Sequence, residues 1–96
     1  MNKQQILGLL EKQKPELMRR FAVRDLALFG STARGEAGDK SDVDILVSFD
    51  GPATSARYFG LLFYLEDHLG RPVDLVTDKA LRPELRPYVD REAIHV

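Results

Sequence analysis

Two short motifs near the middle of the chain carry residue types suited to phosphate and metal chemistry. The pair Gly30-Ser31 is followed by ten residues and then by Asp42-Val43-Asp44. Side chains two apart on a strand project from the same face, so Asp42 and Asp44 would have their Cα atoms roughly 6.5–7 Å apart. Two such carboxylates repel each other unless a cation lies between them. Their hard oxygen atoms suit Mg²⁺, which shares its remaining positions with water and substrate phosphates.

The Gly-Ser pair offers what a nucleoside triphosphate requires. Gly30 lets phosphates approach the backbone, and Ser31, expected to cap a short helix running to about Arg34, contributes a hydroxyl beside the adjacent amides. Arg34 presents a planar guanidinium that can clamp a phosphate, or it forms a surface ion pair with Glu36. Taken alone, Gly-Ser is common in turns, and its meaning comes from the two aspartates that follow.

A third carboxylate, Asp74, interrupts the apolar run Val73–Val76. A charge inside such a strand is costly unless it is paired or bound to a metal. Three carboxylates that converge on Mg²⁺ can hold a triphosphate, and with a second ion they activate an incoming hydroxyl. The alternatives are an edge-strand Asp74 that faces water or pairs with an arginine, and a DxD in which Ser41-Asp42 forms a turn and Asp44 is solvated.

Other candidates carry weaker signals. His68 lies at an expected helix end and His95 near the chain end, and neither has a partner at metal-ligand spacing. The aromatic residues are mostly core, although Tyr58 or Tyr64 could face a partner. A small basic cluster near residues 19–24 is typical of a solvated face, with an acidic partner surface as the alternative.

The apolar spacing predicts an alternation of helices and strands around these residues. Lys3 to about Lys14 is expected to be helical, and Pro15 to interrupt the helix and start a further turn or two. After Asp50-Gly51-Pro52, a helix is expected from Thr54 or Ser55 to His68, ended by Gly70. The remaining expectations are strands at Arg24–Phe29, Asp42–Phe49 and Pro72–Thr77, a loop at Gly35–Gly38, a helical segment from Pro83 toward Asp90 and an edge strand at Ala93–Val96.

Composition bounds the class of protein. The 96 residues suffice for one domain, 44% are hydrophobic and 30% are charged, as in ordinary globular proteins. A net charge of −1 argues against broad electrostatic capture of nucleic acid, so no direct nucleic-acid binding is expected. Without cysteine, neither disulfides nor thiolate sites can form. No long apolar segment suggests a leader or a membrane span, so a cytoplasmic protein without membrane contact is expected.

The residues GSTARGEAGDKSDVD, with LALF before them and ILVSF after, resemble the signature of the nucleotidyltransferase superfamily. The short chain and the later PVDLVT resemble more narrowly the minimal nucleotidyltransferases, commonly encoded beside HEPN-domain proteins and acting as antitoxins. The resemblance implies an α/β (α+β) fold of the DNA polymerase beta-like class, with a small mixed sheet flanked by helices in one domain, residues 1–96. It also implies Mg²⁺ and ATP, with Asp74 binding the catalytic metal and accepting the acceptor's proton.

The function expected from this resemblance is transfer of AMP from ATP to a protein hydroxyl, most simply a tyrosine of a HEPN toxin, which silences the toxin. The expected site comprises Asp42, Asp44 and Asp74 as catalytic metal ligands, with Gly30, Ser31 and Arg34 binding the nucleotide. One alternative is a small-molecule nucleotidyltransferase that needs a partner to hold its acceptor. The other is a non-catalytic antitoxin that neutralises its partner by binding alone.

Overall fold

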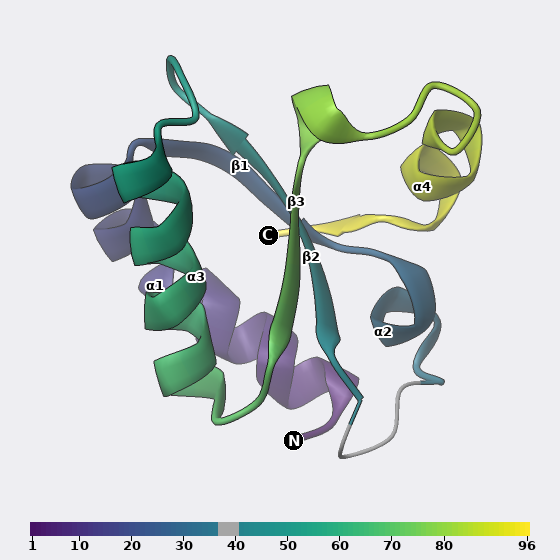
Figure 1. Cartoon of the computed structure of the whole chain (residues 1–96). Helices are drawn as coiled ribbons and strands as arrows, with labels where there is room; N and C mark the ends of the chain where they lie inside the picture. The colour runs from purple at the N-terminus through teal and green to yellow at the C-terminus, as the bar shows by residue number, and fades with distance from the viewer. Residues whose placement is uncertain (37–40) are drawn as a thin grey trace.

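The computed structural model describes residues 1–36 and 41–96 (Figure 1). The last two residues of the loop expected at Gly35–Gly38 lie outside this range. In chain order the elements are α1 (Lys3–Phe21), β1 (Val23–Leu28), α2 (Gly30–Arg34), β2 (Val43–Phe49), α3 (Ser55–Leu69), β3 (Val73–Thr77), a 3₁₀ turn (Asp78–Ala80), α4 (Arg86–Glu92) and β4 (Ile94–His95).

A four-stranded mixed sheet in the order β3-β2-β1-β4 forms the centre of the fold. β1 pairs antiparallel with both β2 and β4, whereas β2 and β3 are parallel. A parallel pair needs a crossover connection, and α3 provides it between β2 and β3. The expected small mixed sheet flanked by helices is therefore confirmed.

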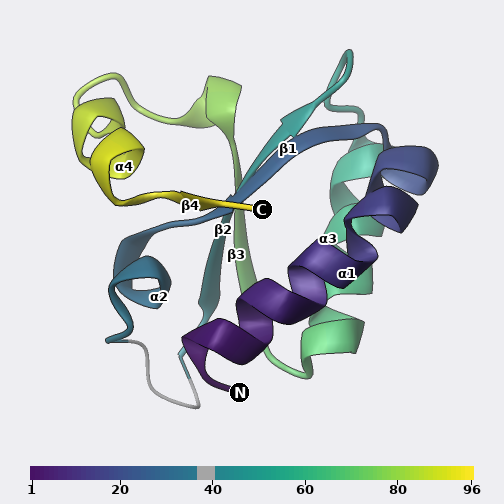
Figure 2. The ribbon, with the colours of Figure 1, turned by 180° about the vertical axis from the view of Figure 1, so that it is seen from behind.

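The two faces of the sheet have different roles. Alternate residues of β2, namely Val43, Ile45, Val47 and Phe49, belong to the main core. Helices α1 and α3 cover this face, while α2 and α4 lie on the other, as both views show (Figures 1 and 2). The residues between those core positions, Asp44 among them, therefore face α2 and α4. A smaller apolar cluster on that second face is built around Ala27, Leu46 and Val89.

Helix α1 corrects the expectation of a break at Pro15. The helix is continuous from Lys3 to Phe21 with Pro15 inside it, and Asn2 and Gln5 form a capping box at its start. Pro15 is exposed, so water can solvate the carbonyl that loses its backbone donor. Burial of Leu10 and Leu17 on either side holds the two halves against the core and outweighs the lost hydrogen bond.

The last helical segment starts later than expected, at Arg86 instead of Pro83. A helix that began at Pro83 would need an N–H at position 87 to reach the Pro83 carbonyl, and Pro87 has none. Residues 83–85 form turns instead, and Pro87 occupies the first turn of α4. The edge strand near the C-terminus is confirmed, but only Ile94–His95 form it.

The remaining expected elements are present within a residue or so of their expected bounds. Thr54 caps α3 by accepting a hydrogen bond from the Arg57 N–H, and Gly70 ends the helix in the left-handed conformation. Over the described parts of the chain, no helix combines the length and the apolar character needed to span a membrane.

Candidate functional site

Asp44 and Asp74 are direct partners on neighbouring parallel strands. Residues in register on adjacent strands project to the same face of a sheet, with strands about 4.8 Å apart. Both side chains therefore emerge side by side on the face that α2 and α4 cover. The predicted convergence of a carboxylate from β3 with one from β2 is present in the structure.

Asp42 lies just before β2 and is exposed. The structure starts the strand at Val43, one residue after the expected start. Electrostatics nevertheless link Asp42 to the other two carboxylates. The pKa of Asp74 is raised by desolvation first, and then by the negative charges of Asp44 and Asp42. Asp42 and Asp44 thus both lie within electrostatic reach of Asp74.

Helix α2 begins at Gly30, where the chain leaves β1 and turns over the sheet. Its N-cap is Phe29, which has no side-chain cap, so the expectation that Ser31 caps this helix is wrong. The Ser31 hydroxyl instead donates to Asp44 Oδ2 at 3.2 Å. Because the helix starts at Gly30, two residues before the start that a Ser31 cap would set, Ser31 lies inside its first turn and faces the carboxylate. The Gly-Ser motif and the acidic motif are in direct contact.

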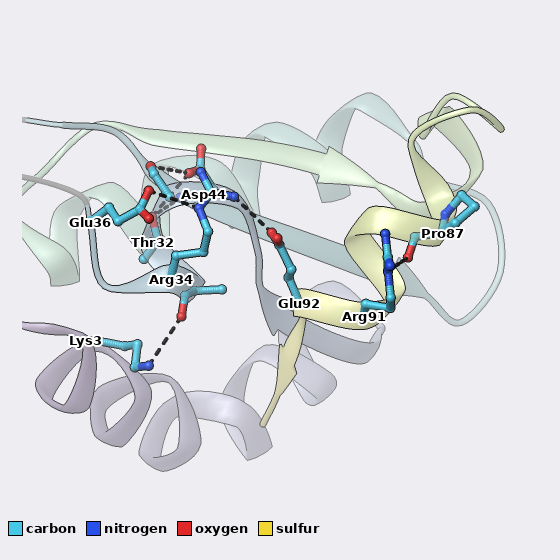
Figure 3. A network of polar contacts seen from close by, with 10 residues as sticks. Lys3, Thr32, Arg34, Glu36, Asp44, Pro87, Arg91 and Glu92 are labelled. Atoms are coloured by element: carbon cyan, nitrogen blue, oxygen red, sulfur yellow. Dashed lines mark hydrogen bonds and ion pairs between the residues drawn. The ribbon is translucent and has the colours of Figure 1, made fainter.

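Thr32 also contacts Asp44, and analysis of the sequence missed it. Its hydroxyl donates to Asp44 Oδ2 at 3.3 Å and accepts from the Asp44 N–H at 3.0 Å (Figure 3). The side chain is 3% exposed. The only signal in the sequence was a second hydroxyl beside Ser31, which also suits a solvated threonine.

Two features require glycine at position 30: its backbone conformation and its close contact with Asp44. Its φ of +59° is left-handed, and a Cβ added there would meet Asp44 Oδ2 at 2.9 Å. The sequence predicted that Gly30, without a side chain, lets phosphates approach the backbone. In the structure a side chain there would collide with the Asp44 carboxylate itself.

Arg34 lies between two glutamates. Its Nε is 3.0 Å from a Glu36 carboxylate oxygen and its Nη1 is 2.9 Å from a Glu92 oxygen, which ties α2 to α4 (Figure 3). The hydrogen bonds that Arg34 donates to Glu36 and then to Glu92 raise the pKa of Arg34. The ion pair with Glu36 that the sequence left open is therefore present. A role of Arg34 toward phosphate stays a prediction.

The weaker candidates have roles outside this group of carboxylates. His95 Nδ1 is 2.8 Å from an Asp25 oxygen, and His68 bonds the Tyr64 carbonyl. Tyr58 donates to the Leu75 carbonyl, and Tyr64 donates to the Gln13 side chain at 2.6 Å. Both tyrosine hydroxyls are thus used inside the protein.

The donor set suits a hard divalent cation that is shared with a substrate. Within residues 1–36 and 41–96, no three His, Cys, Asp or Glu side chains come close enough to enclose a metal ion by themselves. Mg²⁺ is usually held by one or two carboxylates together with water and substrate phosphates. The adjacent carboxylates of Asp44 and Asp74, with Asp42 in electrostatic reach, fit that mode of binding.

Comparisons with known proteins agree with this geometry. The family model described as "Nucleotidyltransferase domain" matches residues 10–94. The chain belongs to the nucleotidyltransferase family. Among its relatives is a protein named protein adenylyltransferase MntA from Thermococcus cleftensis, which is 42% identical over 93 residues and is matched over 97% of this chain and 94% of the relative.

Solved structures support the same nucleotidyltransferase fold. A candidate minimal nucleotidyltransferase superposes with a TM-score of 0.84 at 38% identity, covering 98% of this chain and 95% of that one. A second match is a complex of a tri-AMPylated Shewanella oneidensis HEPN toxin with its MNT antitoxin, with a TM-score of 0.65, 23% identity, and coverage of 92% of this chain and 69% of that one. The expected fold class and the expectation of a nucleotidyltransferase enzyme are confirmed.

The contact between Gly30 and Asp44 generates a first prediction, with Gly35 as a matched control. Gly35 is also left-handed, at φ +72°, but a Cβ there meets nothing within 4 Å. Gly30→Ala and Gly35→Ala should each lower the free energy of unfolding by roughly 1–2 kcal/mol through backbone strain. Only Gly30→Ala should also displace Asp44 and abolish nucleotidyl transfer. Urea unfolding and transfer from α-labelled ATP measure the two effects. Equal loss of transfer in both variants would contradict the assignment.

The raised pKa of Asp74 generates a second prediction, about pH. A folded state that binds a proton more tightly than the unfolded chain loses stability as pH rises through the carboxyl range. Asp74→Asn should therefore raise the stability of the metal-free protein at pH 7. The gain should shrink as pH falls below the pKa of the unfolded carboxyl. Urea unfolding in the presence of a chelator, at pH 7 and at pH 3.5, tests this prediction; pH 3.5 is ~0.4 below the usual pKa of aspartate. The control is Asp67→Asn, which changes an exposed aspartate of α3. A loss of stability at pH 7 would refute it.

Proposed function

We propose that this nucleotidyltransferase transfers AMP from ATP to a hydroxyl of a partner protein, a tyrosine of a HEPN toxin, and so acts as an antitoxin. The observation that carries the proposal is the register of Asp44 with Asp74 beside the first turn of α2. The name of the Thermococcus relative, a protein adenylyltransferase, supports both the adenylyl group and a protein acceptor. The AMPylated HEPN toxin in the Shewanella complex supports the class of partner.

Asp42, Asp44 and Asp74 would hold Mg²⁺, with a second ion in a two-metal arrangement. When bound, the metal neutralises charge on the triphosphate and on the attacking oxygen. The three acids are the only part of the proposed site whose charges repel in the metal-free protein. A cation would therefore relieve an interaction that the fold itself imposes.

Gly30 and Ser31 would bind the nucleotide, and Asp74 would also accept a proton. Gly30 leaves room beside Asp44, and the Ser31 hydroxyl can turn from Asp44 to a phosphate oxygen. The acceptor oxygen forms a bond to the α-phosphorus, the bond from that phosphorus to pyrophosphate breaks, and pyrophosphate leaves. Asp74 takes the hydroxyl proton.

Arg34 can turn toward a phosphate by exchanging Glu36 or Glu92 for it. Its side chain is 42% exposed, and exposed ion pairs of this kind contribute little to stability. Exchange of one carboxylate for a phosphate oxygen should therefore cost little free energy, because both are oxygen anions that accept hydrogen bonds from the same guanidinium. Arg34 is included in the proposed nucleotide site on this basis.

A pair of variants separates binding from chemistry. Asp44→Ala should lose both Mg²⁺–nucleotide binding and transfer. Asp74→Asn keeps the size of the side chain. Because Asp42 and Asp44 would carry the ion that binds the nucleotide, and Asp74 would serve the acceptor hydroxyl, this variant should bind a non-hydrolysable Mg²⁺–ATP analogue about as tightly as wild type, while transfer falls by about 100-fold or more. Calorimetric titration and intact-mass spectrometry of the proposed HEPN partner supply the two measurements.

The outcomes separate the alternatives. Transfer by Asp74→Asn at the wild-type rate would remove Asp74 from the chemistry. If wild type adds no AMP to the HEPN protein but still blocks its toxicity, the antitoxin acts by binding alone. Addition of AMP to a small hydroxyl compound, with none to the protein, would instead support the small-molecule alternative.

A further inference from the structure

The Thr32 hydroxyl is enclosed beside the site and bonds only to Asp44 among the described residues. In the described part of the chain, Thr32 is the one buried residue that is polar or charged. We propose that Thr32 is a positioning residue that fixes the Asp44 carboxylate for metal binding. The inference rests on the proposed function, because it assigns Thr32 a role toward the metal that Asp44 would bind.

The backbone explains why a hydroxyl is needed here. β1 and β2 are antiparallel with Leu28 opposite Ile45, so Phe29 and Asp44 would be the next pair. The Phe29 N–H still donates to the Asp44 carbonyl at 3.1 Å. The Phe29 carbonyl, however, has turned into α2 and accepts from the Ala33 N–H at 3.2 Å. The Asp44 N–H has therefore lost its strand partner, and Thr32 Oγ1 accepts it at 3.0 Å.

The Thr32 hydroxyl accepts the Asp44 N–H and also donates to the Asp44 side chain. Thr32 Oγ1 is 3.3 Å from Asp44 Oδ2, so the two hydrogen bonds close a ring through the backbone and the carboxylate. A side chain held both through its own N–H and through its carboxylate loses rotamer freedom. Groups that orient a metal ligand in this way typically change metal affinity or activity by about 10- to 100-fold when removed.

Ser31 and Thr32 have different freedom to leave Asp44. Ser31 is half-buried and makes one hydrogen bond to Asp44, so it can turn to a phosphate without orphaning another group. Thr32 is enclosed, and a turn away would leave the Asp44 N–H without its acceptor. Both hydroxyls donate to Oδ2, and no described residue donates to Oδ1. Thr32 thereby leaves Oδ1 as the oxygen available to a metal.

Four side chains at position 32 separate the hydroxyl from the packing of the methyl group. Threonine and serine carry the hydroxyl, whereas Thr32→Val and Thr32→Ala do not. Threonine and valine share their shape, as do serine and alanine. Should Thr32→Val fail to fold, the comparison of Thr32→Ser with Thr32→Ala still isolates one oxygen atom. Thr54→Val is the control, since it loses a threonine hydroxyl that accepts a backbone N–H at the start of α3, on the other face of the sheet.

Two readouts are taken on the full chain. The first is Mn²⁺ binding in the presence of a non-hydrolysable ATP analogue, followed by electron paramagnetic resonance. We expect Thr32→Val and Thr32→Ala to weaken it by about 10- to 100-fold, and Thr32→Ser to stay within about threefold of wild type. The second is hydrogen exchange of the Asp44 amide without metal, which should accelerate in the two variants without a hydroxyl. Thr54→Val should change neither.

The result depends on whether the four side chains at position 32 group by the hydroxyl or by the methyl group. If Thr32→Val behaves as wild type while Thr32→Ser and Thr32→Ala fail together, Thr32 acts through packing and the inference is overturned. Unchanged Asp44 exchange in Thr32→Val would overturn it as well. If wild type binds no Mn²⁺–nucleotide while Asp44 exchange still follows the hydroxyl, the hydrogen-bonded ring is supported and the proposed function fails on its own.

Discussion

The carboxylates of Asp44 and Asp74 occupy facing positions on neighbouring parallel strands, and like charges at that spacing repel each other. The sheet imposes this arrangement, because the register of β2 and β3 is set by apolar residues that alternate with the acids. Val43 and Ile45 on β2 and Val73 and Leu75 on β3 are buried in the main core. A slip by one residue would turn these side chains toward the other face. The hydrophobic core thus holds together two charges that would otherwise separate.

This division of the sheet into two faces explains how so small a protein keeps an open acidic site. The apolar area that stabilises the fold lies under α1 and α3. The second face bears a smaller apolar cluster and two short helices, α2 and α4, which Arg34 and Glu92 connect. Few apolar contacts are needed there, so Gly30, Ser31 and Thr32 can be arranged around Asp44. Three consecutive residues of α2 each contact or approach one carboxylate, which places that carboxylate at the junction of helix and strand.

The sequence was sufficient for features that depend on periodicity and on local turn chemistry. Short apolar runs located β2 and β3, and Thr54 and Gly70 located the ends of α3, because caps are short-range interactions. Asp74 was identified as a candidate because a charge inside an apolar strand is costly unless it is paired or bound to a metal. Pro15 was misjudged, since tertiary burial on both sides of it could not be weighed from local preference. Thr32 was missed because its role comes from the Phe29 carbonyl turning away from Asp44, a long-range event without a sequence pattern. The second partner of Arg34, Glu92, could not be foreseen for the same reason, because it lies 58 residues away along the chain.

The central claim is that Asp42, Asp44 and Asp74 hold a divalent cation together with a nucleotide. The most direct test is a crystal structure of the wild-type chain with Mn²⁺ and a non-hydrolysable ATP analogue, in which anomalous scattering locates the metal. The account predicts a manganese peak within about 2.5 Å of carboxylate oxygens of Asp42 and Asp44, shared with the phosphates and next to Asp74. A nucleotide bound at the start of α2 with manganese absent from these carboxylates, or bound to other acids, would contradict it.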